Sequence, residues 1–140
     1  MKAGGQIGSV AEFLLLAEAD HETGSERLRF DTASPEIWQE IILRHPEWKR
    51  TVAANKRLDH RTLRLLAGDE DPAIRLDVAF KNTFPSDLFE HFASDEDDES
   101  VRGRIALHPK IPLEILKRLA VDRSEWVSER ATECLAQRSG

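Results

Sequence analysis

The chain has 140 residues, the size of a single domain that can bury a continuous core without disulfides or metals. It carries 20 Lys and Arg against 26 Asp and Glu, a formal net charge of −6, and this balance argues against sequence-independent binding to phosphate backbones. We therefore expect no nucleic-acid partner.

The only cysteine, Cys134, excludes an intramolecular disulfide and any cluster held by cysteines alone, and it favours a reducing compartment. No apolar run approaches the roughly 20 residues that a membrane span requires. The start of the chain has one lysine and a short apolar stretch interrupted by Glu12 and Glu18, which does not resemble a signal peptide. We expect a cytoplasmic protein with no membrane partner.

Residues 9–36 are predicted to form a helical cap on the N-terminal side of the molecule. Ser9 and Glu12 have the spacing of a capping box ahead of an apolar run, which predicts a helix of about 10 residues from Val10. A second helix is expected over about residues 22–33.

The rest of the chain divides into a repeat array at residues 37–137 and two ends, residues 1–8 and 138–140, which we expect to be disordered. Within the array, three segments superimpose with separations of 26 and 27 residues, and a partial copy lies on each side of them. The equivalent residues are Ala53, Ala79 and Ala106; Leu63, Phe89 and Leu116; Leu66, Phe92 and Leu119; and Asp69, Asp95 and Asp122.

Each copy contains two apolar stripes with helical spacing and is therefore predicted to form two short helices. Asp71 and Pro72 place an N-cap acceptor before a proline in the first helical turn, and Pro85 and Pro112 open the second helices of their copies. A helix pair this short leaves its apolar stripe uncovered and must stack on the next pair. The expected fold is all-α, a short α-solenoid with an N-terminal helical cap.

The stretch VAFKNTFPSDLFEHFASDEDDESVRGRIALHPKIPLEILKRLAVD resembles the leucine-rich repeat variant family, which is related to HEAT-type solenoids. The likeness rests on a Val-Ala pair, an Asn or His-Pro turn, a Pro-opened helix ending in Leu-Ala and an Asp-rich loop before Val-Arg, and it extends over about residues 37–135. The resemblance implies a right-handed stack of helices and no reaction. The founding kind of member carries an iron–sulfur cluster on a cysteine-rich segment, and residues 1–36 contain no cysteine, so no cofactor is expected.

The histidines do not form a pair with metal-ligand spacing, and we expect no metal site. At the position of His108 the other copies carry Asn55 and Lys81. A residue before a proline is pushed out of the helical region, so we interpret His108, which precedes Pro109, as the end of a first helix.

Charged residues recur beside the loops between copies. The acidic run 95–99 lacks the ligand pattern of a calcium loop and is interpreted as a solvated loop whose charges favour the start of the next helix. Arg75 and Arg102 occupy one repeat position near Asp69 and Asp95, which indicates an inter-repeat ion-pair ladder; a row of ligand-binding arginines is the alternative.

The sequence contains no arrangement typical of an active site, neither a Ser-His-Asp order nor a Gly-rich phosphate loop nor a paired-carboxylate cleft, so we expect no catalytic residues and no enzyme. Trp38, Trp48 and Trp126 lie at the ends of the array. They either close the core at its caps or, for Trp38 and Trp126, anchor an interface.

The function expected from this pattern is a non-catalytic module that binds one partner protein. Apolar positions are alike across copies, whereas some side chains of the second helices vary in charge, as on a recognition surface. The expected partner-binding residues are Arg61, Arg64, Leu65, Asp87, Glu90, His91, Glu114, Lys117 and Arg118. The stretch WQEIILRHPEWKRTVAANK also resembles small bacterial repeat proteins found beside secreted toxins, which implies an alternative role as an acidic immunity protein. DNA binding, a third possibility, would need a basic stripe that the charge mixture does not offer.

Overall fold

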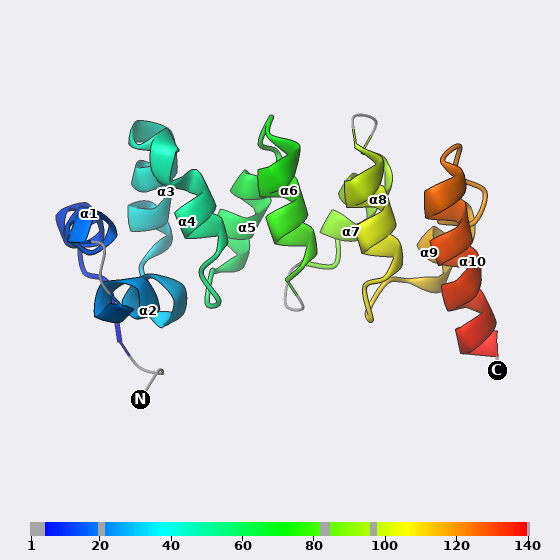
Figure 1. Ribbon diagram of the computed structural model, residues 1–140, viewed down its shortest axis with the longest axis horizontal. Helices are drawn as coiled ribbons and strands as arrows, with labels where there is room; N and C mark the ends of the chain where they lie inside the picture. Colours follow the sequence, from blue (N-terminus) through cyan, green and yellow to red (C-terminus); the bar gives the residue numbers. More distant parts are fainter. Residues whose placement is uncertain (1–4, 20–21, 82–84, 96–97, 140) are drawn as a thin grey trace. The chain divides into compact units, whose positions relative to one another are not determined.

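The computed structural model describes residues 5–19, 22–81, 85–95 and 98–139. These residues form helices joined by turns and contain no strand (Figure 1). A single isolated bridge among them pairs Gln6 with Thr32. None of the helices in these ranges is long and apolar enough to cross a membrane. The predicted all-α class is confirmed.

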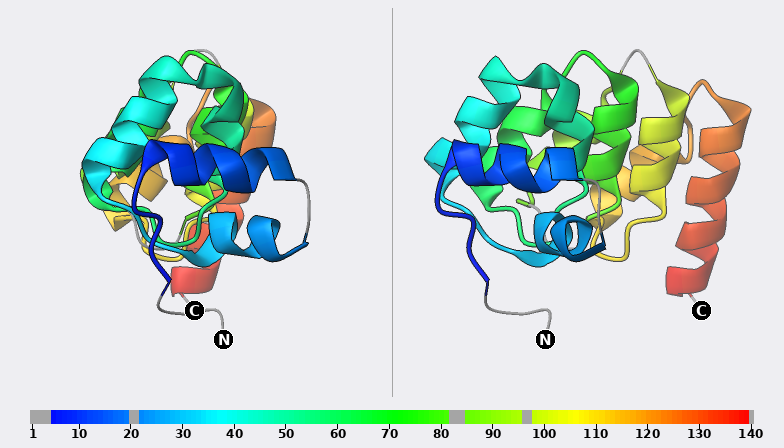
Figure 2. Two further views of the ribbon diagram at one scale, coloured as in Figure 1. Left: turned by 90° about the vertical axis from the view of Figure 1, so that its left-hand side faces the viewer. Right: turned by 60° about the vertical axis from the view of Figure 1, so that its left-hand side comes forward.

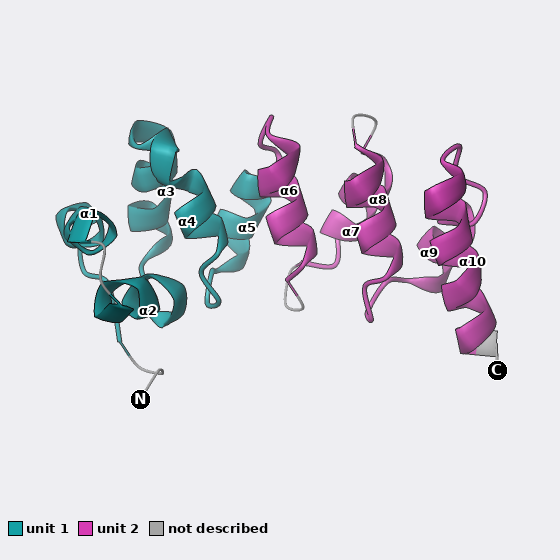
Figure 3. Cartoon of the chain, viewed as in Figure 1, with its two compact units in different colours: residues 1–66 teal, residues 67–140 magenta. Residues whose placement is uncertain are grey.

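Two compact units make up the chain, residues 1–66 and residues 67–140 (Figure 3). The predicted end of the cap, at residue 36, lies inside the first unit. Each unit has buried apolar side chains of its own.

The first unit is built from short helices that pack on their neighbours. Its elements are α1 (Val10–Ala19), α2 (Glu22–Phe30), α3 (Pro35–Arg44), the 3₁₀ turn η1 (Pro46–Trp48), α4 (Lys49–Ala53) and α5 (His60–Ala67), whose last residue belongs to the second unit. Helix α1 lies against α2 and α3, and α4 lies against both of these (Figure 2). The predicted capping box is confirmed, because Ser9 Oγ accepts from Glu12 N at 3.0 Å and α1 begins at Val10.

Residues 5–8 are held against the first unit, where the sequence predicted disorder. Ile7 N donates to Thr32 O at 2.7 Å and Thr32 N donates to Gly5 O at 3.1 Å, and the Ile7 side chain is fully buried. The same hydrogen bonds explain why α2 ends at Phe30 rather than near residue 33. At the other end α10 continues to Ser139, so residues 138 and 139 are also helical. Residues 1–4 and 140 lie outside the described ranges.

The core of the first unit centres on Trp38. Its side chain is fully buried, and the ring of Phe13 meets it edge-on with the centroids 6.0 Å apart. Trp38 therefore closes the core, which confirms the first of the two alternatives predicted for it, and it is not an interface anchor. Ile41, Val52 and Leu63 are fully or almost fully buried in the same unit.

The second unit has two layers of helices. Its elements are α6 (Pro72–Ala79), α7 (Leu88–Ala93), α8 (Glu99–Ala106), α9 (Leu113–Leu119) and α10 (Glu125–Ser139). Helix α8 packs between α6 and α10, and α7 and α9 lie beside each other against this layer (Figure 1). Apolar residues that are equivalent in the sequence repeat are buried here in each copy: Ala79 and Ala106; Phe89 and Leu116; Phe92 and Leu119; Ile74, Val101 and Val127; Val78, Ile105 and Ala131.

The helix starts in the second unit follow the predicted caps with one difference. Asp71 precedes α6 and accepts from Ala73 N at 2.9 Å, and Asp98 caps α8 by accepting from Ser100 N at 2.7 Å. Pro112 directly precedes α9, as predicted. Helix α7 begins at Leu88, three residues after Pro85, because Pro85 O accepts from Leu88 N at 3.0 Å in an intervening turn.

Trp126 packs on a glycine of the neighbouring helix. A Cβ atom built on Gly103 of α8 would overlap the indole ring, so α10 approaches α8 at a point where no side chain stands between them. Arg130 covers another part of the ring, with its guanidinium carbon 4.6 Å from the centroid. The residue as a whole remains 38% exposed.

Candidate interaction surface

The nine side chains expected to bind a partner are all exposed. Three of them lie on α5 in the first unit, and the other six lie on α7, at its N-cap or on α9 in the second unit. Exposure is compatible with recognition, but solvated faces share it, so the binding role of these residues stays a prediction. The geometry around them differs between the two units.

In the first unit the α5 residues border a small cavity beside α3. Arg61 Nη1 donates to Glu36 Oε2 at 3.0 Å and Arg61 Nη2 donates to Gln39 Oε1 at 3.1 Å. The start of α5 is held by Asp59, which accepts from Thr62 N at 2.8 Å and from Thr62 Oγ1 at 2.7 Å. The cavity has a volume of about 300 Å³ and is lined by Pro35, Gln39, Arg61, Thr62, Arg64 and Leu65.

In the second unit an ion pair joins α7 and α9. The guanidinium of Arg118 donates to both carboxylate oxygens of Glu90, and both side chains are exposed. On α9 itself, Lys117 Nζ lies 3.7 Å from Glu114 Oε1. Exposed pairs of this kind contribute about 0.2–1 kcal/mol each, so they orient the side chains more than they stabilise the fold.

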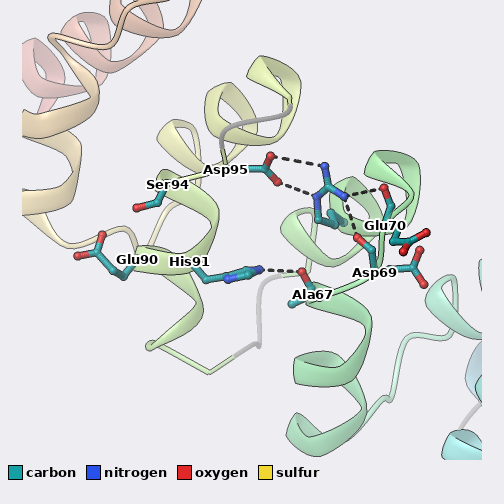
Figure 4. Close-up of a pocket in the computed structure, with 9 residues that line it drawn as sticks. Ala67, Asp69, Glu70, Glu90, His91, Ser94 and Asp95 are labelled. Atoms are coloured by element: carbon teal, nitrogen blue, oxygen red, sulfur yellow. Dashed lines mark hydrogen bonds and ion pairs between the residues drawn. The ribbon is translucent and has the colours of Figure 1, made fainter.

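A larger cavity, of about 610 Å³, lies between α7 and the turn that precedes α6 (Figure 4). His91 spans its width, with Nε2 2.8 Å from the carbonyl oxygen of Ala67. Because a carbonyl only accepts, Nε2 carries the proton in this contact. The lining residues are Ala67, Gly68, Asp69, Glu70, Arg75, Glu90, His91, Ser94 and Asp95.

The lining of this cavity is acidic. It contains four carboxylates against the single guanidinium of Arg75, a formal charge of −3 with His91 neutral. The Arg75 side chain is buried in the wall, where Nε donates to Asp95 Oδ2 at 2.7 Å. Its Nη1 donates to the carbonyl oxygens of Asp69 at 2.7 Å and Glu70 at 3.0 Å. Asp95 is paired with Arg75, and Glu90 with Arg118. The carboxylates of Asp69 and Glu70 therefore give the cavity a negative potential.

Arg102 repeats this pairing one copy later. Its Nε donates to Asp122 Oδ2 at 2.9 Å and its Nη2 to Asp122 Oδ1 at 3.2 Å, while Nη1 donates to the carbonyl oxygen of Asp95 at 2.6 Å. Each arginine thus binds the main chain of one aspartate and the carboxylate of the equivalent aspartate in the next copy. The predicted ion-pair ladder is confirmed, and the alternative of a ligand-binding arginine row is wrong, because both guanidinium groups are buried and paired.

The paired carboxylate of Asp122 titrates below its ordinary range. Burial by itself raises the pKa of Asp122, but the hydrogen bonds from Arg102 and from Ser124 N and the charge of Arg102 outweigh it, so the net shift is downward. The ionised form is therefore the stable one in the fold. The prediction for the acidic run is confirmed at Asp98, which caps α8. It is wrong at Asp95, whose side chain is buried and paired with Arg75 rather than solvated. Residues 96 and 97 lie outside the described ranges.

The described residues contain no group of three or more His, Cys, Asp or Glu side chains placed to hold a metal ion. Sequence reasoning found Glu90 and His91 but missed the acidic residues across the cavity, Asp69 and Glu70. No repeat offset links these residues to α7. Only the packing of α7 beside the preceding turn places them in one cavity.

Comparison of the chain with protein-family models, with curated proteins and with solved structures gives no match. The fold and the surface together define an all-α protein with exposed second-helix residues of both charges, an acidic cavity beside α7 and buried arginine–aspartate pairs. Its likeness to the leucine-rich repeat variant family stays a prediction.

Proposed function

We propose that this chain is a non-catalytic module that binds one partner protein through exposed side chains of α5, α7 and α9. One observation carries the proposal: at equivalent repeat positions the apolar residues are buried and alike, whereas the exposed residues differ in chemistry from copy to copy. The exposed sets are Arg61, Asp87 and Glu114; Arg64, Glu90 and Lys117; and Leu65, His91 and Arg118. Variation on a regular scaffold is how stacked-repeat proteins specify a partner.

We further propose that the helix pairs are repeats of a short right-handed α-solenoid related to the leucine-rich repeat variant and HEAT-like families, acting in the cytoplasm without a cofactor. The equivalent pairing of Arg75 and Arg102 supports this, because each arginine reaches the aspartate of the next copy. A solenoid places equivalent contacts at each step of the stack.

The acidic cavity favours a basic partner. The chain has a net charge of −6, and the cavity beside α7 has a lining charge of −3 with His91 neutral. These charges also support the second candidate function, an immunity protein that occludes a basic toxin. Co-expression tests that candidate: the chain should rescue growth of cells that produce a toxin encoded beside its gene, and failure with every neighbouring candidate would reject it.

Reversing the charge of α7 should weaken partner capture without unfolding the protein. In the variant Asp87→Lys/Glu90→Lys we expect at least a tenfold loss in affinity for the partner isolated with the wild-type chain from native lysate. The melting temperature should fall by no more than a few degrees, because both replaced side chains are exposed and interactions at exposed positions, such as the Glu90–Arg118 pair, are worth at most about 1 kcal/mol each. Pull-down titration and thermal unfolding measure the two effects.

The matched control reverses two exposed charges of the same unit away from the second helices, Glu129→Lys/Glu133→Lys on α10. It should capture the partner as the wild type does. Equal losses of capture in both variants would show a general charge effect, and would rule out α7 as the recognition surface.

A further inference from the structure

His108 is buried in the turn between α8 and α9 and joins two main-chain groups that are far apart in the sequence. Its Nδ1 accepts from Lys110 N at 3.0 Å, and its Nε2 lies 2.9 Å from the carbonyl oxygen of Lys81, which follows α6. The ring of Phe89 from α7 meets the imidazole edge-on with the centroids 4.9 Å apart. Only 2% of the residue is exposed.

The two hydrogen bonds determine the protonation state of the ring. The Lys110 N–H needs an unprotonated Nδ1, and the Lys81 carbonyl needs a proton on Nε2. Only the neutral Nε2–H tautomer satisfies both. A second proton, on Nδ1, would face the Lys110 N–H and place an uncompensated charge in a buried site, so the Lys110 hydrogen bond cannot persist in the charged form, whereas Nε2–H can still donate to Lys81 O.

Asn55 makes the same link at the equivalent position of an earlier copy. Its Oδ1 accepts from Arg57 N at 2.7 Å, two residues on, as His108 accepts from Lys110. Its Nδ2 donates to Leu28 O at 2.8 Å, 27 residues earlier, which is also the separation between His108 and Lys81. The amide does not titrate, so the chain contains one version of the link that responds to protons and one that does not.

The charges around His108 oppose its protonation. Arg104 on α8 and Lys110 on the same turn carry positive charges that disfavour a proton on the ring. Lys81, which follows α6, contacts the ring through its carbonyl oxygen. Helix α7 contributes Phe89, while the neighbouring Glu90 is paired with Arg118 of α9. Burial lowers the pKa of His108 below its ordinary value, the hydrogen bond to Lys81 opposes this, and Arg104 and Lys110 lower it further.

We propose that His108 is a proton-sensitive link that fixes the α8–α9 turn at neutral pH, and that protonation of the imidazole breaks its hydrogen bond with Lys110 N and loosens the turn. The pKa is lower in the folded state than the ordinary value of about 6.5 in the unfolded chain. The link therefore contributes fully above about pH 6.5 and loses its contribution as the pH falls through the folded-state pKa. The turn leads directly into α9, so acidification loosens the start of α9.

Hydrogen exchange tests the link in the full chain. We measure protection of the non-proline amides in residues 107–113 from pH 7.5 to pH 5, corrected for intrinsic exchange, in the wild type and in His108→Asn. One proton changes the opening equilibrium up to tenfold per pH unit, so wild-type protection should fall by up to about that factor per unit below pH 6.5. The asparagine variant should keep its protection, because Asn55 makes both hydrogen bonds at the equivalent position.

Two further measurements keep the result decisive. NMR of the wild-type imidazole should report the Nε2–H tautomer at pH 7.5 and a pKa below 6.5, whether or not any variant folds. His91→Asn, which changes an exposed histidine of the same unit, should retain the wild-type pH dependence. Parallel pH profiles in the wild type and His108→Asn, a proton on Nδ1, or a pKa of 6.5 or above would each overturn the proposal.

Discussion

Replacing Arg102 by methionine should lower the free energy of unfolding by about 3–5 kcal/mol, the usual cost of leaving one member of a buried ion pair without its partner. The carboxylate of Asp122 would lose two hydrogen bonds and its compensating charge in a site that is almost closed to water. The carbonyl of Asp95 would lose its donor as well. Urea denaturation at pH 7 measures the change, read as a lower midpoint at constant slope.

The double variant Arg102→Met/Asp122→Asn should recover about half of this loss or more. It removes the unpaired charge but keeps a side-chain oxygen that can accept the hydrogen bond from Ser124 N, which Asp122 Oδ1 accepts at 2.8 Å in the wild type. Two results would contradict the claim that the unpaired charge of Asp122 causes the loss of stability. One is a single variant that loses less than about 1 kcal/mol, and the other is a double variant that is no more stable than the single one.

The pH dependence of stability distinguishes an Asp122 carboxylate paired with Arg102 from an unpaired one. In the wild type the folded-state pKa of Asp122 is lowered, so its contribution is present above the ordinary carboxyl value of 3.8 and is lost as the pH falls through the folded-state value. Without Arg102, burial is opposed only by the hydrogen bond from Ser124 N and the charge of Arg123, so the pKa of Asp122 is higher than in the wild type. The deficit of Arg102→Met should therefore shrink as the pH falls from 7 to 4, and a constant deficit would contradict this account.

Gly103→Ala should destabilise the protein by about 1–3 kcal/mol, the range for overpacking a filled site. The usual effect of this change inside a helix has the opposite sign, a gain of about 0.5–1 kcal/mol. The sign reverses here because the new Cβ atom overlaps the Trp126 ring, which must move away from α8. Urea denaturation gives the free energy, and the exposed fraction of the indole can be followed by fluorescence quenching.

Trp126→Ala provides the control background. With the ring removed, Gly103→Ala should be neutral or stabilising, and the difference between the two backgrounds is the coupling energy of the contact. Gly8→Ala is a second control, since a Cβ there meets only Glu12 Oε1 at 3.6 Å, an ordinary contact. Stabilisation by Gly103→Ala in the wild-type background would show that α10 does not pack on α8 through this glycine.

The helices and their buried faces could be predicted because their signals are local. The Ser9–Glu12 spacing located the start of α1, the Asp71–Pro72 pair located the start of α6, and the apolar period identified the residues that are buried. Each of these depends on a few neighbouring residues and on the 3.6-residue turn of a helix. The ordered segment at residues 5–8 escaped prediction because Ile7 is a lone apolar residue with no period around it.

The residues of the candidate surface were predicted from the repeat, whereas their surroundings were not. The repeat offsets selected Glu90 and His91, which are exposed and line the acidic cavity. Asp69 and Glu70 precede α6 and meet α7 only after the chain has folded back, so their distance along the chain hides them. The ladder differs, because arginine recurs at one repeat position and this recurrence indicated the pairing even though Arg75 and Asp95 are 20 residues apart.

The sequence by itself determined the helical class, the repeat offsets and the alternation of buried and exposed positions, because these follow from local periodicity and from the need to bury apolar stripes. The tertiary structure alone decided the role of His108. From the sequence this residue was a helix end with Asn55 and Lys81 as its equivalents, a solvated or turn-forming position. Packing buries it at 2% exposure and supplies the Lys81 carbonyl from 27 residues away. A hydrogen bond of that range has no local signature, so only the folded chain shows that the turn holds a single neutral tautomer.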